Sequence, residues 1–105
     1  MQLPKTTALH LFLFALIVAS TVSPVLAADI TLAWDANSEP DLAGYNVYRR
    51  EAQEPARRMN EGLLRTPLLR DSTVEPGRSY TYWVTAVDLT GNESLPSPVA
   101  SVETQ

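Results

Sequence analysis

The stretch YTYWVTAVD, residues 80–88, is the clearest strand signal in the sequence. Its aromatic and β-branched residues are those that β-strands favour, and two sets of side chains alternate along it. Because successive side chains of a strand point to opposite faces, one set faces the interior and the other faces outward. The inward set is predicted to be Tyr80, Tyr82, Val84 and Ala86, and the outward set Thr81, Trp83, Thr85 and Val87.

Two earlier stretches, DITLAW at residues 29–34 and YNVYR at residues 45–49, also alternate and predict strands with one buried face. Residues 35–44 between them are rich in turn formers and are predicted to form a loop. In the first strand Ile30, Leu32 and Trp34 lie on one side, and in the second Tyr45, Val47 and Arg49 lie on one face with Asn46 and Tyr48 on the other.

The rest of the chain is less regular. Residues 51–62 contain a proline and alternating charges, which predicts a connection that holds either a short edge strand near residues 57–60 or a helix of two turns. Further strands are predicted at residues 68–74 and 99–102. About six strands at spacings of roughly ten residues, with turn signals between them, are typical of an antiparallel sandwich.

The first 27 residues differ from the rest of the chain. Lys5 precedes an apolar run at residues 11–19, and small residues follow it. This order predicts a secretory signal peptide at residues 1–27, a domain at residues 28–105, and a periplasmic or extracellular location. The alternative is an uncleaved membrane tether, the one case in which we expect membrane contact, although the apolar run is shorter than the about 20 residues of a membrane span.

Composition argues against several classes of function. Beyond residue 27 the chain has seven arginines against twelve acids, a net charge near −5, whereas a nucleic-acid partner requires a basic face. The sequence has no cysteine, and its only histidine, His10, lies in the predicted leader. The domain therefore lacks a thiol nucleophile and the usual general base. We predict no enzyme, no cofactor and no nucleic-acid partner.

Three segments, ITLAWDA from residue 30, DLAGYNVYR from residue 41 and VEPGRSYTYWVTAVDLTGNES from residue 74, together resemble the fibronectin type III repeats of bacterial exported proteins. The resemblance implies an all-β, immunoglobulin-like antiparallel sandwich. It also implies that Tyr80 is a corner tyrosine whose hydroxyl ties the preceding turn. The predicted structural core consists of Trp34, Tyr45, Val47, Tyr80, Tyr82 and Val84.

The resemblance leaves one strand unaccounted for. A typical repeat has a strand before residues 29–34, and cleavage after Ala27 leaves almost nothing to form it, so we expect the first strand to be short or missing. The open edge can pair with a strand from a partner or from a second copy. Alternatively, residues 28 and 29, charged side chains and a loop that covers the edge are enough to protect the strand from such pairing.

Two acidic loops raise the question of a calcium site. Proline stands at position 40, where a calcium loop turns on glycine, and no bidentate glutamate follows at the needed distance. The alternative is that these side chains cap turns, and we predict no metal. The loop residues concerned are Asp35, Asn37, Glu39 and Asp41 in one loop and Asp88, Asn92 and Glu93 in the other.

The outward aromatic side chains offer a better candidate for function. Tyr48 and Trp83 face away from the inward sets, and the resemblance makes their strands neighbours. With Arg50 they form a predicted binding surface, because Trp, Tyr and Arg are the usual interface anchors. The alternative is cross-strand packing that only stiffens the sheet. We expect an interaction or spacer module that binds a protein or a cell surface, or alternatively a carbohydrate-binding module that accompanies polysaccharide degradation.

Overall fold

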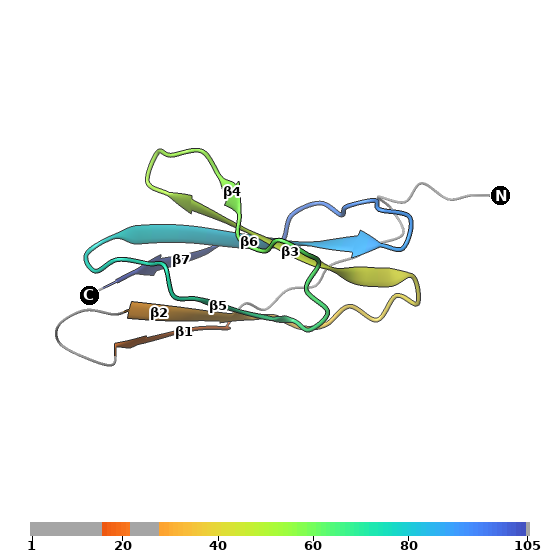
Figure 1. The fold of residues 1–105 in the computed structure, drawn as a ribbon, viewed down its shortest axis with the longest axis horizontal. Coiled ribbons are helices and arrows are strands. Elements are labelled where there is room, and N and C mark those ends of the chain that lie inside the picture. Colours follow the sequence, from red (N-terminus) through yellow and green to blue (C-terminus); the bar gives the residue numbers. More distant parts are fainter. Residues whose placement is uncertain (1–15, 22–27, 105) are drawn as a thin grey trace.

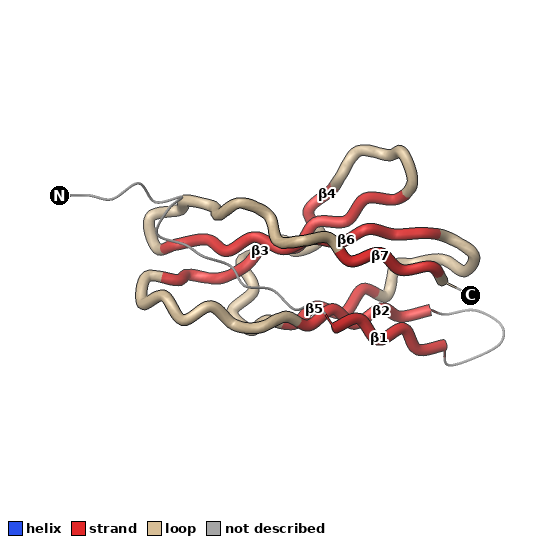
Figure 2. The backbone as a smooth tube through the Cα atoms, turned by 180° about the vertical axis from the view of Figure 1, so that it is seen from behind, coloured by secondary structure: helices blue, strands red, loops and turns tan. Residues whose placement is uncertain are grey.

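The computed structural model describes residues 16–21 and 28–104, which form two antiparallel sheets packed face to face (Figures 1 and 2). One sheet has the strand order β1-β2-β5 and the other β4-β3-β6-β7. The described residues include no helix, and so none that could cross a membrane. The strands are β1 (Leu16–Thr21), β2 (Ala28–Ala33), β3 (Leu42–Glu51), β4 (Arg57–Arg58), β5 (Leu68–Asp71), β6 (Ser79–Asp88) and β7 (Ala100–Glu103).

Each strand predicted from alternation has a counterpart in the structure. The strongest prediction, residues 80–88, corresponds to β6, and the prediction at residues 45–49 is the central part of the longer β3. Within the predicted range 57–60, Arg57–Arg58 form the short edge strand β4, which pairs with β3, and no helix forms there. The last strand, predicted at residues 99–102, lies one residue later.

A strand precedes β2 in the intact chain. Leu16–Thr21 forms β1 and pairs antiparallel with β2, with Leu16 opposite Ala33 and Thr21 opposite Ala28. The expectation of a short or missing first strand concerned a chain cut after Ala27, whereas the structure is that of the uncut chain. The predicted domain boundary therefore separates β1 from β2, and cleavage at that point stays a prediction.

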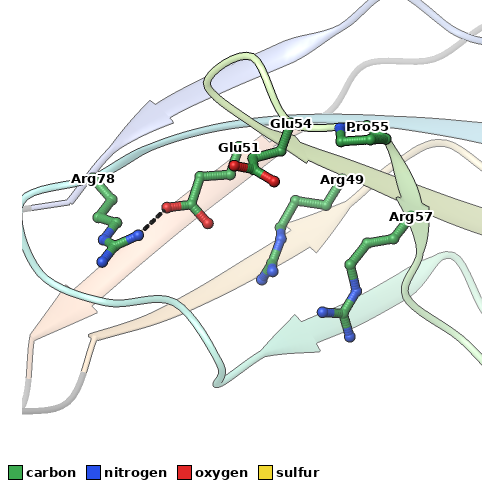
Figure 3. A pocket seen from close by; sticks show the side chains of 6 residues that line it. All are labelled: Arg49, Glu51, Glu54, Pro55, Arg57 and Arg78. Carbon is green, nitrogen blue, oxygen red and sulfur yellow. Dashed lines mark hydrogen bonds and ion pairs between the residues drawn. The ribbon is translucent and has the colours of Figure 1, made fainter.

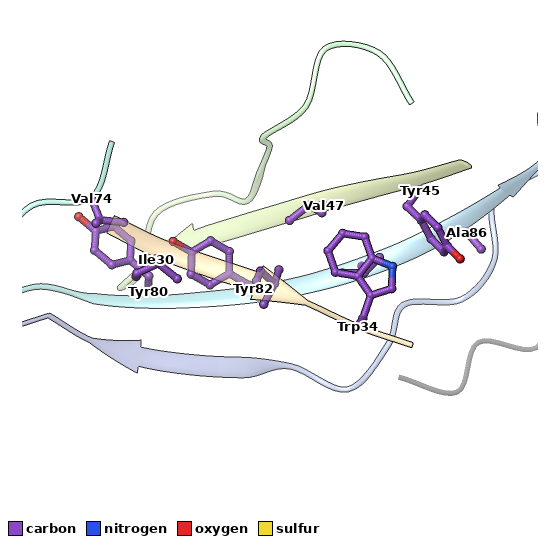
Figure 4. Close-up of a cluster of buried hydrophobic side chains, with 10 residues drawn as sticks. Ile30, Trp34, Tyr45, Val47, Val74, Tyr80, Tyr82 and Ala86 are labelled. Atoms are coloured by element: carbon purple, nitrogen blue, oxygen red, sulfur yellow. The ribbon is translucent and has the colours of Figure 1, made fainter. Parts of the chain in front are cut away.

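The core lies between the two sheets and is formed by the inward side chains of β2, β3 and β6 together with Trp34, just after β2, and Val74, in the connection between β5 and β6 (Figure 4). The Trp34 ring meets the Tyr45 ring edge to face, with 5.4 Å between the ring centroids. The corner tyrosine lies where the resemblance implies, since its hydroxyl accepts a hydrogen bond from the Glu75 backbone N–H at 2.8 Å. All six residues predicted as structural core are buried: Trp34, Tyr45, Val47, Tyr80, Tyr82 and Val84.

Candidate functional site: an aromatic and arginine patch

The central strands β3 and β6 bring the predicted binding residues together. Tyr48 lies directly opposite Trp83 in the β3–β6 ladder, and Arg50 lies two residues further along β3. Alternation places all three on the outer face of the four-stranded sheet, because Tyr45 and Val47 on β3 and the core residues of β6 face inward. We call Tyr48, Arg50 and Trp83 the aromatic patch.

Within the patch, Tyr48 and Arg50 both contact Trp83. The rings of Tyr48 and Trp83 are stacked, with centroids 6.0 Å apart and planes inclined by 14°. The guanidinium carbon of Arg50 lies 5.7 Å from the centroid of the Trp83 ring. Stacking and cation–π contact each contribute roughly 0.5–1.5 kcal/mol, so the patch is a preformed unit rather than three independent side chains.

Glu93 fixes one end of the patch. Its Oε2 accepts hydrogen bonds from the Tyr48 hydroxyl at 2.5 Å, from Asn46 Nδ2 at 3.3 Å and from the Thr85 hydroxyl. Burial alone would raise the pKa of Glu93, but these hydrogen bonds and the charge of Arg58 lower it below the usual value. The pKa of Tyr48 is raised by burial and by the Glu93 carboxylate, so its hydroxyl stays protonated and remains a donor.

Sequence reasoning assigned Glu93 to an acidic loop and missed its place beside the patch. Glu93 lies 45 residues beyond Tyr48 in the chain and reaches it only because the loop after β6 folds back, with a bridge between Glu93 and Val87. No periodic pattern in the sequence marks such a return.

The surface that this patch offers is a stacked aromatic pair beside an exposed arginine. The Trp83 ring already has two partners within the chain, Tyr48 and Arg50, so it is not a bare stacking platform. Two partly exposed aromatic side chains thus lie beside an exposed arginine, and Trp, Tyr and Arg are the residue types enriched at the centres of protein interfaces.

In one of the two acidic loops, Asp88 caps the turn that follows β6. The Asp88 carboxylate accepts hydrogen bonds from the backbone N–H groups of Thr90 and Asn92 at 3.0 and 2.9 Å. Burial would raise the pKa of Asp88, but these bonds lower it. The two loops do lie at the same end of the sandwich, since the Leu89 N–H donates to the Asp41 carbonyl. Across residues 16–21 and 28–104, no three acidic or histidine side chains are grouped closely enough to hold a metal ion.

A buried polar cluster joins the two sheets. Asp71 on β5 accepts hydrogen bonds from Arg49 Nη1 at 2.9 Å and from the Tyr82 hydroxyl at 2.6 Å. Its other oxygen accepts from the backbone N–H and the hydroxyl of Thr73. The inward position of Arg49 follows from alternation, but its carboxylate partner lies 22 residues away and was not predicted.

Comparisons with known proteins extend the description of the fold. No family model matches this chain, and no curated protein matches it. A solved myokine structure is similar at a TM-score of 0.64 and 17% identity, over 84% of this chain and 90% of that chain. An Fn3-like protein from Clostridium thermocellum is similar at a TM-score of 0.61 and 27% identity, over 85% and 88% of the two chains.

A third similar structure is the pectate lyase PelI of Erwinia chrysanthemi, solved in complex with tetragalacturonic acid. It matches at a TM-score of 0.62 and 22% identity, over 84% of this chain but only 28% of that chain, so the likeness concerns one part of the lyase. The chain therefore has an all-β, immunoglobulin-like sandwich of the fibronectin type III-like kind.

Proposed function

We propose that this chain is an exported, non-catalytic interaction module that binds a protein partner through the aromatic patch. The observation that carries the proposal is the preformed stack of Tyr48 and Trp83 with Arg50 beside it. Rigid aromatic side chains lose little conformational entropy when a partner covers them, and Trp, Tyr and Arg dominate the energetics of protein interfaces. The leader predicted at residues 1–27 supports export.

The lack of the common catalytic groups supports a binding role. The sequence beyond residue 27 contains no histidine and no cysteine. The lowered pKa of Glu93 and the raised pKa of Tyr48 arise from mutual hydrogen bonding, and each shift keeps its group in its ordinary charge state at neutral pH. Neither group is poised to exchange a proton near pH 7, as a general acid or base would be.

A carbohydrate-binding module is the second candidate. Planar aromatic side chains on a sheet suit sugar rings, and a similar part of the Erwinia chrysanthemi pectate lyase belongs to an enzyme solved with tetragalacturonic acid. The contacts of Trp83 with Tyr48 and Arg50 weigh against it, because a sugar that stacks on the tryptophan must compete with partners already in place. We therefore favour a protein partner.

Retention of the purified chain on two matrices tests the proposal. One matrix is the cell-envelope fraction of the producing organism, used intact or after protease digestion, and the other is a series of protein-free insoluble polysaccharides. We expect retention on the intact envelope fraction, loss of retention after digestion, and loss for both Trp83→Ala and Arg50→Gln. The second variant changes an exposed side chain, so it keeps the test valid if the first variant is unstable.

Leu95→Ala is the matched control, since Leu95 is 76% exposed and lies outside the patch. Retention on pure polysaccharide that Trp83→Ala abolishes would establish the carbohydrate alternative instead. Equal retention of the wild-type chain, both patch variants and the Leu95 control would refute a binding role for the patch.

A further inference from the structure

Strand β3 presents a second group of charged side chains on the face opposite the aromatic patch. These side chains line a pocket of about 320 Å³, beside the hairpin of β3 and β4 (Figure 3). The volume lies at the lower end of the range of small-molecule pockets, about 300–1,000 Å³. The lining residues are Arg49, Glu51, Glu54, Pro55, Arg57 and Arg78.

The pairing of two arginines across the hairpin is the unusual feature of this pocket. Arg57 on β4 lies directly opposite Arg49 on β3 in the antiparallel ladder. Side chains at directly opposed positions project from the same face of the sheet, and like charges placed in this way destabilise a strand pair. Among the described residues, Arg49 has a carboxylate neighbour in Asp71, whereas no ion pair includes Arg57. Within the described residues, the charge of Arg57 is therefore not offset by an ion pair.

Arg49 is held in a fixed orientation at the base of the pocket. Its side chain is only 8% exposed, and its Nη1 donates to Asp71 and to the Thr73 hydroxyl, each at 2.9 Å. Its guanidinium carbon lies 4.9 Å from the centroid of the Tyr80 ring. Both of these hydrogen bonds use Nη1, and a guanidinium carries further donors on Nε and Nη2.

Charged groups of both signs line the pocket. Figure 3 shows the head groups of Arg49 and Arg57 pointing the same way, with the carboxylates of Glu51 and Glu54 toward the side of Arg78. Glu51 is already paired with Arg78 at 2.5 Å, and among residues 16–21 and 28–104 no ion pair includes Glu54. A ligand that fits therefore carries a negative group at one end and hydrogen-bond donors at the other.

We propose that this pocket binds a sugar acid, with its carboxylate between Arg49 and Arg57 and its hydroxyl groups donating to Glu54. Guanidinium groups match the planar carboxylate with paired, charge-assisted hydrogen bonds. A sugar acid carries that carboxylate on a ring of hydroxyl groups, which suits a lining that is polar except for Pro55. The site shares no residue with the aromatic patch and stands independently of the function proposed for it.

Calorimetric titration of the full chain with three probes at low ionic strength tests the proposal. The probes are an oligosaccharide of glucuronic acid, the neutral glucose oligosaccharide of equal length, and an acidic peptide. We expect the uronate to bind at least about tenfold more tightly than the other two, because only it supplies both the carboxylate and the hydroxyl groups. We expect Arg57→Gln to weaken uronate binding by about tenfold, the loss typical of one charge-assisted hydrogen bond.

Arg65→Gln is the matched control, since Arg65 is an exposed arginine outside the pocket and should leave uronate affinity unchanged. A second readout separates binding from a structural role: Arg57→Gln should leave the urea midpoint of the free chain unchanged or raised, because it removes a like charge beside Arg49. No uronate binding, preference for the acidic peptide, or equal affinities of the two arginine variants would overturn the proposal.

Discussion

Replacing Asp71 by alanine removes the acceptor of four hydrogen bonds from the middle of the fold. Asp71 is 3% exposed and receives its bonds from Arg49, Tyr82 and Thr73. Because Arg49 and Tyr82 belong to one sheet and Asp71 to the other, the cluster joins the two layers directly. The alanine variant leaves the Arg49 guanidinium charged, largely buried and without its carboxylate.

The expected loss in the free energy of unfolding is about 3–5 kcal/mol, the range for breaking a buried ion pair by removing one partner. A domain of this size has roughly 5 kcal/mol of stability, so the variant should be close to unfolding at room temperature. The double variant Asp71→Ala with Arg49→Met should lose less than Asp71→Ala alone, because the uncompensated charge is removed as well.

Urea denaturation followed by tryptophan fluorescence measures these differences. Asp35→Ala is the control, since Asp35 is exposed, and it should change the free energy of unfolding by no more than about 0.5 kcal/mol. A loss below about 1 kcal/mol for Asp71→Ala, or a double variant less stable than the single one, would refute the reasoning, because it would mean that water solvates Arg49 in the folded state.

Three further predictions follow from the same structure. Tyr80→Phe should lower the free energy of unfolding by about 1 kcal/mol in urea titration, because the Glu75 N–H loses its acceptor; an unchanged midpoint would argue against the corner bond. Gly44→Ala should cost about 1–3 kcal/mol in thermal unfolding, since an added Cβ would lie 2.7 Å from the Leu64 carbonyl oxygen; a stable variant would show that the neighbouring backbone moves aside. Burial would raise the pKa of Asp71, but hydrogen bonds from its partners lower it below the unfolded value, so its stabilisation is present above the unfolded pKa and lost as the pH falls through the folded one. Unfolding free energies measured between about pH 5 and pH 2 should therefore fall more steeply for the wild-type chain than for Asp71→Asn.

The sequence by itself determined most of the secondary structure and the composition of the core. Alternation separates the faces of a strand without reference to the rest of the chain, because successive side chains must point in opposite directions. The same local rule put Tyr45 and Tyr48 on opposite faces of one strand and Tyr82 and Trp83 on opposite faces of another, and the family resemblance indicated that Trp34 and Tyr45 face the interior. For residues 57–60 the sequence left two interpretations open, a short strand or a helix. A strand of two residues is too short for its alternation to exclude a helix.

Only the tertiary structure decided which distant residues meet. Glu93 reaches Tyr48 through a returning loop, Asp71 reaches Arg49 across the gap between the sheets, and Arg57 lies opposite Arg49 through the register of a hairpin. Alternation specifies a face but neither a register nor a partner strand, and both depend on contacts between residues far apart in the chain. The candidate sites of this protein arise from such contacts, which is why the sequence supplied their strands and not their full set of residues.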